Sequence, residues 1–205
     1  MTVDWLRHRR RILVSRLFVP LFGVFAALLM LSPLAAAQPA TPEKNSYFVT
    51  LDAVLKTIQQ SAEFSQLVET HNQQAEAWSD DEIQARDRRW RQGDQTLIEP
   101  LLANQLSKAL AKVAAASDGV VAEIIVMGKR GCNIAISSVT SDYWQGDEAK
   151  WKRTFGADTS DRFIDRVDFD KSTNTFSQQI SQRFTVNGQP AGAITIGFDI
   201  VYRPK

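Results

Sequence analysis

The chain has 205 residues, of which 44% are hydrophobic and 23% charged, and its formal net charge is +1. Residues 1–37 hold five Arg and one Asp, so their removal takes the net charge to −3. This mild acidity, with no basic stripe, argues against nucleic acid as a partner. The single cysteine, Cys132, excludes an intrachain disulfide. Only one histidine, His71, follows residue 37, which removes most catalytic arrangements.

The N-terminus has the pattern of an export signal. Five arginines precede an apolar run over residues 17–34, Pro33 breaks that run, and the small residues 35–37 form a cleavage site before Gln38. We therefore expect residues 1–37 to be a cleaved signal peptide and the mature protein to be periplasmic. An uncleaved membrane anchor is the alternative, because the run is almost long enough to span a bilayer.

The first half of the mature chain is expected to be helical after a Pro-rich, flexible lead-in over residues 38–46. Apolar residues recur there at helical spacing, and acidic or Ser residues stand where helices would begin. The predicted helices cover about residues 51–58, 61–71, 80–90 and 96–116.

The second half is expected to form strands. A run that is apolar on both faces is typical of a central strand, and the later runs alternate apolar and polar residues. The predicted strands cover about residues 120–127, 132–138, 162–169, 175–186 and 192–202, and Asn-Gly at 187–188 favours a hairpin between the last two. The sequence thus predicts an α+β domain over residues 47–205, with long N-terminal helices packed on a five-stranded antiparallel PAS-like sheet.

Strand 175–186 places two glutamines among apolar residues. Gln178 and Gln182 share a face with Phe176, Ile180 and Phe184, whereas the odd-numbered residues occupy the other, wet face. Buried glutamines must be hydrogen-bonded, or each costs about 1–3 kcal/mol. Two interpretations remain open: they bond to each other or to nearby backbone, or they line a polar ligand cavity.

The segment 141–151, SDYWQGDEAKW, concentrates aromatic and charged residues. Flat rings give contact area and nearby charges orient a ligand, so the segment is typical of a lid over a small-molecule pocket. Ligand contacts are predicted for Tyr143, Trp144 and Trp151, with polar contacts from Asp142 and Lys150. The alternative is that the rings pack on the sheet, that Asp142 caps a short helix, and that Lys150 is solvated.

The order of helices, hairpin, aromatic insertion and final strand resembles the single-module Cache (PAS-like) extracellular sensor domains. The resemblance lies in Ile124–Ser138, Thr140–Phe155 and Gly188–Ile200, and covers nearly all of residues 47–202. It implies a ligand between the sheet and the aromatic lid, with Tyr143 and Trp144 among the contacts. Receptors of this kind continue into a membrane helix and an output domain, whereas this chain ends at Lys205, so its signal is expected to pass to a membrane-bound signalling protein.

The expected function is therefore binding without chemistry of a small polar molecule, for example one that bears a carboxylate. No metal-ligand spacing, phosphate loop or nucleophile motif is present in the sequence, so no cofactor, metal or catalytic residue is predicted. The alternative is a ligand-free interaction subunit that docks onto a membrane signalling protein. A hydrolase using His71 or Asp142 is a weaker third hypothesis, and a homodimer stays open.

Overall fold

The computed structural model describes residues 44–170 and 175–201. The predicted signal peptide and most of the predicted lead-in lie outside these ranges. Within them, no helix is both long enough and apolar enough to cross a membrane.

The helices occupy the first half of the domain, as the periodicity predicts. Ser61 caps one of them by accepting from the backbone N–H of Phe64, and Ser79 forms a capping box with Glu82. The helices are α1 (Lys44–Gln59), α2 (Ala62–Glu76), α3 (Asp80–Arg91), α4 (Gln95–Ala103), α5 (Gln105–Ala116) and the short α6 (Ala149–Lys152).

One helix prediction is corrected. The stretch predicted as a single helix over 96–116 is two helices, because Asn104 adopts an extended conformation between them. Its side chain accepts from the backbone N–H of Ser107 at 2.8 Å and donates to the carbonyl of Ile134 at 3.0 Å. Asn competes for backbone hydrogen bonds in this way, so it favours a cap over a helix interior.

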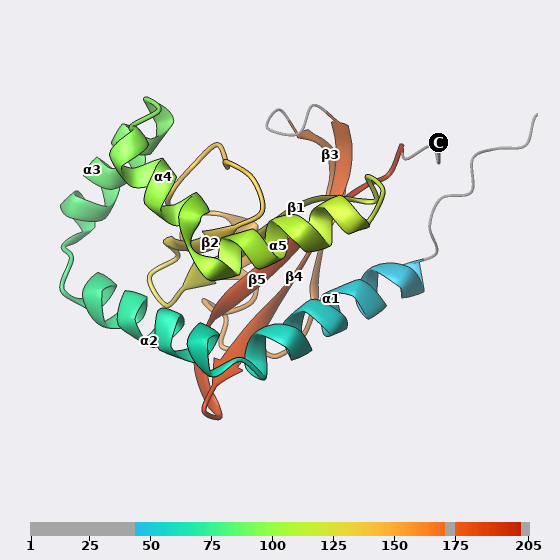
Figure 1. Cartoon of the computed structure of the whole chain (residues 1–205), viewed down its shortest axis with the longest axis horizontal. Coiled ribbons are helices and arrows are strands. Elements are labelled where there is room, and N and C mark those ends of the chain that lie inside the picture. The colour runs from blue at the N-terminus through green and yellow to red at the C-terminus, as the bar shows by residue number, and fades with distance from the viewer. Residues whose placement is uncertain (1–43, 171–174, 202–205) are drawn as a thin grey trace, which may run out of the picture. The chain divides into compact units, whose positions relative to one another are not determined.

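The strands form one antiparallel sheet in the order β2-β1-β5-β4-β3, which confirms the predicted α+β PAS-like fold (Figure 1). The strand predicted from residue 192 begins earlier, at Gln189. The strands are β1 (Val121–Gly128), β2 (Asn133–Ile136), β3 (Phe163–Asp170), β4 (Thr175–Val186) and β5 (Gln189–Asp199).

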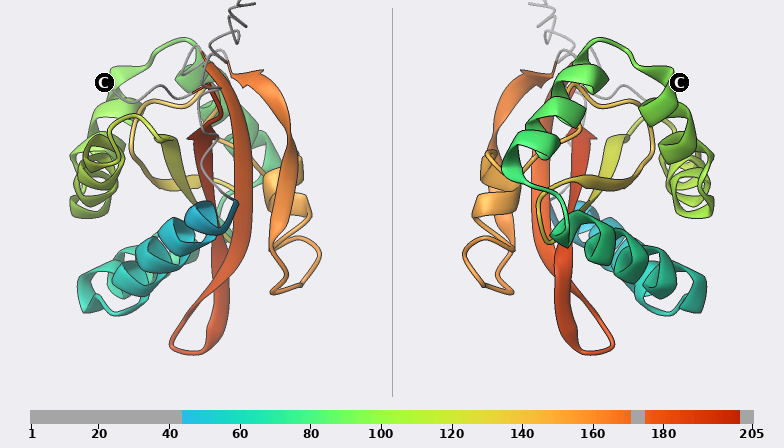
Figure 2. Two further views of the ribbon diagram at one scale, coloured as in Figure 1. Left: turned by 90° about the vertical axis from the view of Figure 1, so that its right-hand side faces the viewer. Right: turned by 90° about the vertical axis from the view of Figure 1, so that its left-hand side faces the viewer.

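One face of the sheet is covered by α1, α2 and α5, and we call it the helix face (Figures 1 and 2). Its core is continuous, and Tyr47 of α1 stacks on Phe198 of β5 with ring centroids 4.1 Å apart. The even-numbered residues of β4 point to this face, since Ile180 pairs with Ile196 and both lie in that core. The helix face supplies most of the domain's apolar burial.

The opposite face, which we call the lid face, is divided. Over β1 and β2 lies a second apolar cluster that includes Trp90 of α3, Ile98 of α4 and Tyr143 of the segment after β2. Over β4 and β5 the same face is polar, because Ser181 and Thr195 are buried there and hydrogen-bond to each other at 2.8 Å. The buried polar side chains of the lid face therefore lie beside its packed apolar cluster.

Candidate functional site

The segment over residues 140–155, which we call the lid, is anchored to α3 through one buried carboxylate. Asp87, 2% exposed, accepts from the backbone N–H groups of Tyr143 and Trp144 at 2.9 and 3.0 Å, and its other oxygen pairs with Arg91 at 2.7 Å. Arg91 also pairs with Asp142 at 2.7 Å. Because two backbone donors depend on a single buried acceptor, the base of the lid is fixed rather than free to swing.

The lid's aromatic rings anchor it to the β1–β2 turn. The indole N–H of Trp144 donates to the carbonyl of Arg130 at 2.7 Å, and that of Trp151 donates to the carbonyl of Gly128 at 3.0 Å. Tyr143 is buried against Trp90, with ring centroids 5.8 Å apart, and burial raises the pKa of its hydroxyl. These rings therefore pack as part of the second apolar cluster.

A polar pocket of about 630 Å³ lies between the lid, β3 and the polar half of the sheet. We call it the lid pocket. Buried polar side chains from both walls line it, and its charged residues are four acidic and three basic. Its lining residues with polar side chains are Glu123, Thr140, Ser141, Gln145, Glu148, Lys150, Arg153, Asp165, Arg166, Asp168, Ser177 and Gln179.

The floor of the lid pocket is built across three strands. Glu123 of β1 and Gln179 of β4 both lie opposite Gly197 of β5, and the Gln179 amide donates to the Glu123 carboxylate at 2.7 Å above that glycine. A Cβ at position 197 would stand 2.8 Å from Cγ of Glu123. The glycine is thus required by the close approach of the carboxylate, which is only 4% exposed.

The lid supplies the opposite wall with one charged pair and one amide. The Lys150 side chain, 9% exposed, pairs with Glu148 at 3.0 Å. The amide nitrogen of Gln145 donates to the carbonyl of Asp142 at 2.8 Å, whereas its oxygen is buried without a hydrogen-bond partner. A buried acceptor without a hydrogen-bond partner is rare in folded proteins.

The predicted site residues do not all meet. Lys150 lines the lid pocket, and Tyr143, Trp144, Trp151 and Asp142 lie outside its lining. Trp144 and Trp151 instead border a smaller hollow of about 260 Å³ beside α3. The two predicted glutamines are on the helix face, away from the lid.

Gln178 and Gln182, for which lining of a polar ligand cavity was one interpretation, are not part of the lid pocket. Gln178 donates to the carbonyl of Asp165 at 3.0 Å, and Gln182 accepts from Arg162 at 3.1 Å. Both are therefore hydrogen-bonded within the chain: Gln178 bonds to backbone, as one of the two interpretations proposed, and Gln182 bonds to a side chain. The face predicted to be merely wet, with Ser177 and Gln179, is the one that lines the lid pocket. Alternation in β4 separated the faces correctly, but it could not show which face the lid covers.

His71 and Cys132 lie outside the lid pocket. Burial, assisted by the charge of Arg86, lowers the pKa of His71 to about 4, and burial raises the pKa of the Cys132 thiol to about 12. His71 is thus neutral and Cys132 protonated near neutral pH, and a thiol is not a nucleophile. Among the described residues no cluster of His, Cys, Asp and Glu has the arrangement of a metal site.

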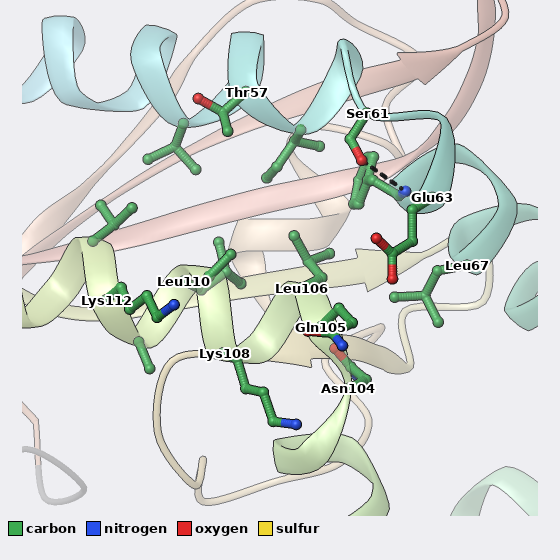
Figure 3. A pocket seen from close by; sticks show the side chains of 16 residues that line it. Thr57, Ser61, Glu63, Leu67, Asn104, Gln105, Leu106, Lys108, Leu110 and Lys112 are labelled. Carbon is green, nitrogen blue, oxygen red and sulfur yellow. Dashed lines mark hydrogen bonds between the residues drawn. The ribbon is translucent and has the colours of Figure 1, made fainter.

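The helix face carries a second hollow, of about 620 Å³, between α1, α2 and α5 (Figure 3). Ile58, Phe64 and Leu110 at its base are each less than 4% exposed. Its lining also includes polar residues, among them Thr57, Glu63, Lys108 and Lys112 (Figure 3). Its exposed lining is mostly apolar, so it offers fewer groups that would orient a polar ligand than the lid pocket does.

Neither a family model nor a curated protein matches the sequence. Solved structures similar to the chain include the sensor domain of the V. cholerae histidine kinase DctB, with a TM-score of 0.44 and 10% identity over 77% of this chain and 56% of that chain. The E. coli DcuS sensor domain has a TM-score of 0.43 and 11% identity over 76% and 90% of the two chains. The sensory domain of the Campylobacter jejuni chemoreceptor Tlp3 with isoleucine bound has a TM-score of 0.36 and 11% identity over 77% and 64%.

These are sensor domains, the kind of protein that the sequence resembles. The chain spans little more than half of the DctB structure and less than two thirds of the Tlp3 structure. With all three TM-scores below 0.5, the comparison carries no conclusion about ligand or partner. The functional proposal below is based on the lid pocket.

Proposed function

We propose that this protein is a sensor module that binds a small polar molecule in the lid pocket and passes the signal to a membrane-bound signalling protein. The observation that carries the proposal is the convergence of buried polar groups from opposite walls: Glu123 from the sheet, and Lys150 and Gln145 from the lid. Burying such groups is unfavourable, so a site that is both concave and polar is typical of ligand recognition.

Binding without chemistry fits the composition of the pocket better than catalysis does. Its lysine is committed to Glu148, and the only described histidine, His71, lies outside its lining. A general acid or base needs a titratable group within reach of the substrate, free to exchange a proton. The proposed location is the periplasm, after cleavage of residues 1–37.

The ligand of the proposal is small and polar, and a carboxylate is one group that Arg153 would attract. The experiment is a thermal-shift screen of polar metabolites on the mature chain. A stabilising compound should lose its effect in Ser177→Phe, which fills the pocket from the β4 side, and keep it in Thr57→Phe on the far side of the sheet. If the compound still stabilises Ser177→Phe, it binds outside the lid pocket and the proposal is overturned.

A second candidate, an interaction subunit, is favoured by a different surface. Val167, Phe169 and Phe176 lie together at one end of the β3–β4 pair, each 45–48% exposed, and the two Phe rings are 5.4 Å apart. Apolar side chains gathered on a surface favour a protein contact. A photocrosslinker at position 176 should capture a membrane protein in the native cell under this hypothesis, and one at Thr57 should not. Equal capture at both positions would exclude it.

A further inference from the structure

The hollow between α1, α2 and α5, which we call the trough, is open and mostly apolar (Figure 3). Core side chains close its base, whereas its sides carry apolar surface that the core does not cover. Leu67 of α2 and Val113 of α5 are only partly buried, and Ala109 of α5 is exposed. The lining follows α5 from Gln105 to Val113, which is about 12 Å along the helix axis. An elongated, mostly apolar lining suits an extended hydrocarbon chain better than a compact polar molecule.

The uncharged polar groups at the rim of the trough are mostly hydrogen-bonded within the chain. The Thr57 hydroxyl donates to the carbonyl of Ala53 at 2.9 Å. The Ser61 hydroxyl accepts from the backbone N–H of Phe64 at 3.2 Å. The Asn104 side chain accepts within α5 and donates to a carbonyl of β2. These groups therefore contribute little to the selection of a polar ligand.

Two lysines of α5 remain uncommitted in the trough. Lys108 and Lys112 are exposed and one helical turn apart, and neither has an ion-pair partner among the described residues. The acidic residue of the lining, Glu63, lies at the α2 end, whereas Lys112 lies at the opposite end (Figure 3). Two lysines and one glutamate give the trough a net positive charge, which favours an anionic group.

From this arrangement we infer that the helix face carries a second binding site, for a long-chain carboxylate whose hydrocarbon tail lies along the trough and whose carboxylate meets Lys108 and Lys112. The inference goes beyond the proposed function and is independent of the lid pocket. A hydrocarbon tail is stabilised by leaving water and needs no hydrogen bond, so the committed polar groups of the rim do not oppose it. The lysine ammonium groups can reach one carboxylate because their stems are long and flexible.

The first test compares amphiphiles that share a tail and differ in the head group. Dodecanoate, dodecanol and dodecyltrimethylammonium are titrated into the mature chain by calorimetry, each below the concentration at which it aggregates. Dodecanoate should bind about fivefold or more tightly than the other two, the effect of two exposed ion pairs. Octanoate should bind about tenfold or more weakly than dodecanoate, because it buries fewer methylenes. Equal affinity for the three head groups, or no binding of dodecanoate, would overturn the inference.

Lysine variants test the head-group contact. The double variant Lys108→Met and Lys112→Met keeps apolar side chains and removes both charges, so it should weaken dodecanoate about fivefold and leave dodecanol unchanged. Lys56→Met, on the exposed side of α1 and outside the trough lining, is the matched control and should change neither affinity. An unchanged affinity for dodecanoate in the double variant would contradict the inference.

The two sides of the sheet test where the tail lies. Thr57→Phe obstructs the trough and should weaken dodecanoate about tenfold or more, whereas Ser177→Phe obstructs the lid pocket and should leave dodecanoate unaffected. The reverse pattern would place dodecanoate in the lid pocket and overturn the inference without contradicting the proposed function. Loss of dodecanoate binding in Thr57→Phe, with no polar metabolite binding at all, would uphold the inference and contradict the proposed function.

Light scattering tests a second copy of the chain as the occupant. The wild-type mature chain and Thr57→Phe should have the same mass in solution, because the trough is proposed to hold a small molecule. A wild-type dimer that Thr57→Phe converts to a monomer would show that a second copy fills the trough, and the inference would be wrong.

Discussion

The two faces of the sheet are built from the same strands but have different roles. On the helix face, α1, α2 and α5 cover a continuous apolar core in which side chains such as Leu51 and Val68 are completely buried. On the lid face, apolar packing extends from β1 only as far as Ala193 of β5, and buried polar groups take over across the rest of β5 and β4. The difference teaches that one face stabilises the domain, whereas the other holds a polar cavity in place through a lid fixed at α3 and at the β1–β2 turn.

The largest effect is expected for Trp90, which joins the lid to α3. Trp90→Ala removes a ring that is 2% exposed and the hydrogen bond from its indole to the carbonyl of Thr140, at a cost of about 3–5 kcal/mol. Urea unfolding measures the loss, and hydrogen exchange at the Tyr143 amide shows whether the lid opens first. Leu51→Ala on the helix face is the control: it should destabilise the domain without preferential exchange in the lid.

Asp87 tests whether a single carboxylate holds the base of the lid. Asp87→Leu leaves the buried N–H groups of Tyr143 and Trp144 without an acceptor, which should cost about 3 kcal/mol in the free energy of unfolding. Arg91→Met removes the half-exposed counter-charge of this buried carboxylate and its pair with Asp142, and should cost about 1–2 kcal/mol, less than Asp87→Leu. Similar losses in the two variants would show that the ion pair, rather than the backbone contacts, anchors the lid.

His71 of α2, whose Nε2 lies 3.5 Å from the Tyr143 hydroxyl, makes this contact between α2 and the lid sensitive to acid. Its pKa is about 4 in the folded chain and 6.5 when it is unperturbed, so the unfolded chain binds this proton first as the pH falls. The stabilising contribution is complete above about pH 6.5 and is lost towards pH 4; at pH 5 the loss is about 2 kcal/mol. The check is the difference in unfolding free energy between wild type and His71→Leu at pH 7 and pH 5. A constant difference would contradict the prediction.

Gly197 provides a test of whether the pocket floor takes part in ligand binding. Gly197→Ala brings a Cβ against Glu123 and should displace the carboxylate from Gln179, costing about 1–2 kcal/mol in stability and abolishing ligand binding. Calorimetry with the stabilising compound from the metabolite screen measures the second effect. Normal binding by this variant would show that the floor pair is not part of the recognition site.

The smallest effect is expected on the helix face at Gln182. Gln182→Leu removes a partly buried hydrogen bond with Arg162 and should change the unfolding free energy by about 0.5 kcal/mol, with ligand affinity unaffected. Thermal unfolding and calorimetry check the two statements. A loss of binding here would reverse the assignment of the two faces.

Much of the fold follows from local pattern. Helical spacing predicted the helices, and alternation with an Asn-Gly turn predicted five strands in the right order along the chain. The break at Asn104, which the sequence did not predict, shows the limit of local pattern. The extended conformation of Asn104 is stabilised by a hydrogen bond to Ile134, thirty residues away in the sequence. Propensity within a window has no access to such a partner.

The candidate site was harder to predict from the sequence than the fold was. The aromatic lid residues have a ligand-like composition, yet Trp144 and Trp151 donate to backbone carbonyls of the β1–β2 turn. The floor pair, Glu123 and Gln179, is separated by 56 residues and meets only because both strands flank Gly197. A signal was present in the isolated glutamate of an otherwise apolar strand, since such a residue must find a polar partner.

The sequence by itself determined the elements, their order and the two faces of each strand, because helical and strand periodicities are properties of neighbouring residues. It also determined that aromatic and charged residues gather after the hairpin. Only the tertiary structure decided which face the lid covers and which of its side chains reach a cavity. Strand pairing and packing bring together residues far apart in the chain, and for this reason the lid pocket is built from Glu123, Gln179, Gln145 and Lys150 rather than from the rings that dominate the local sequence.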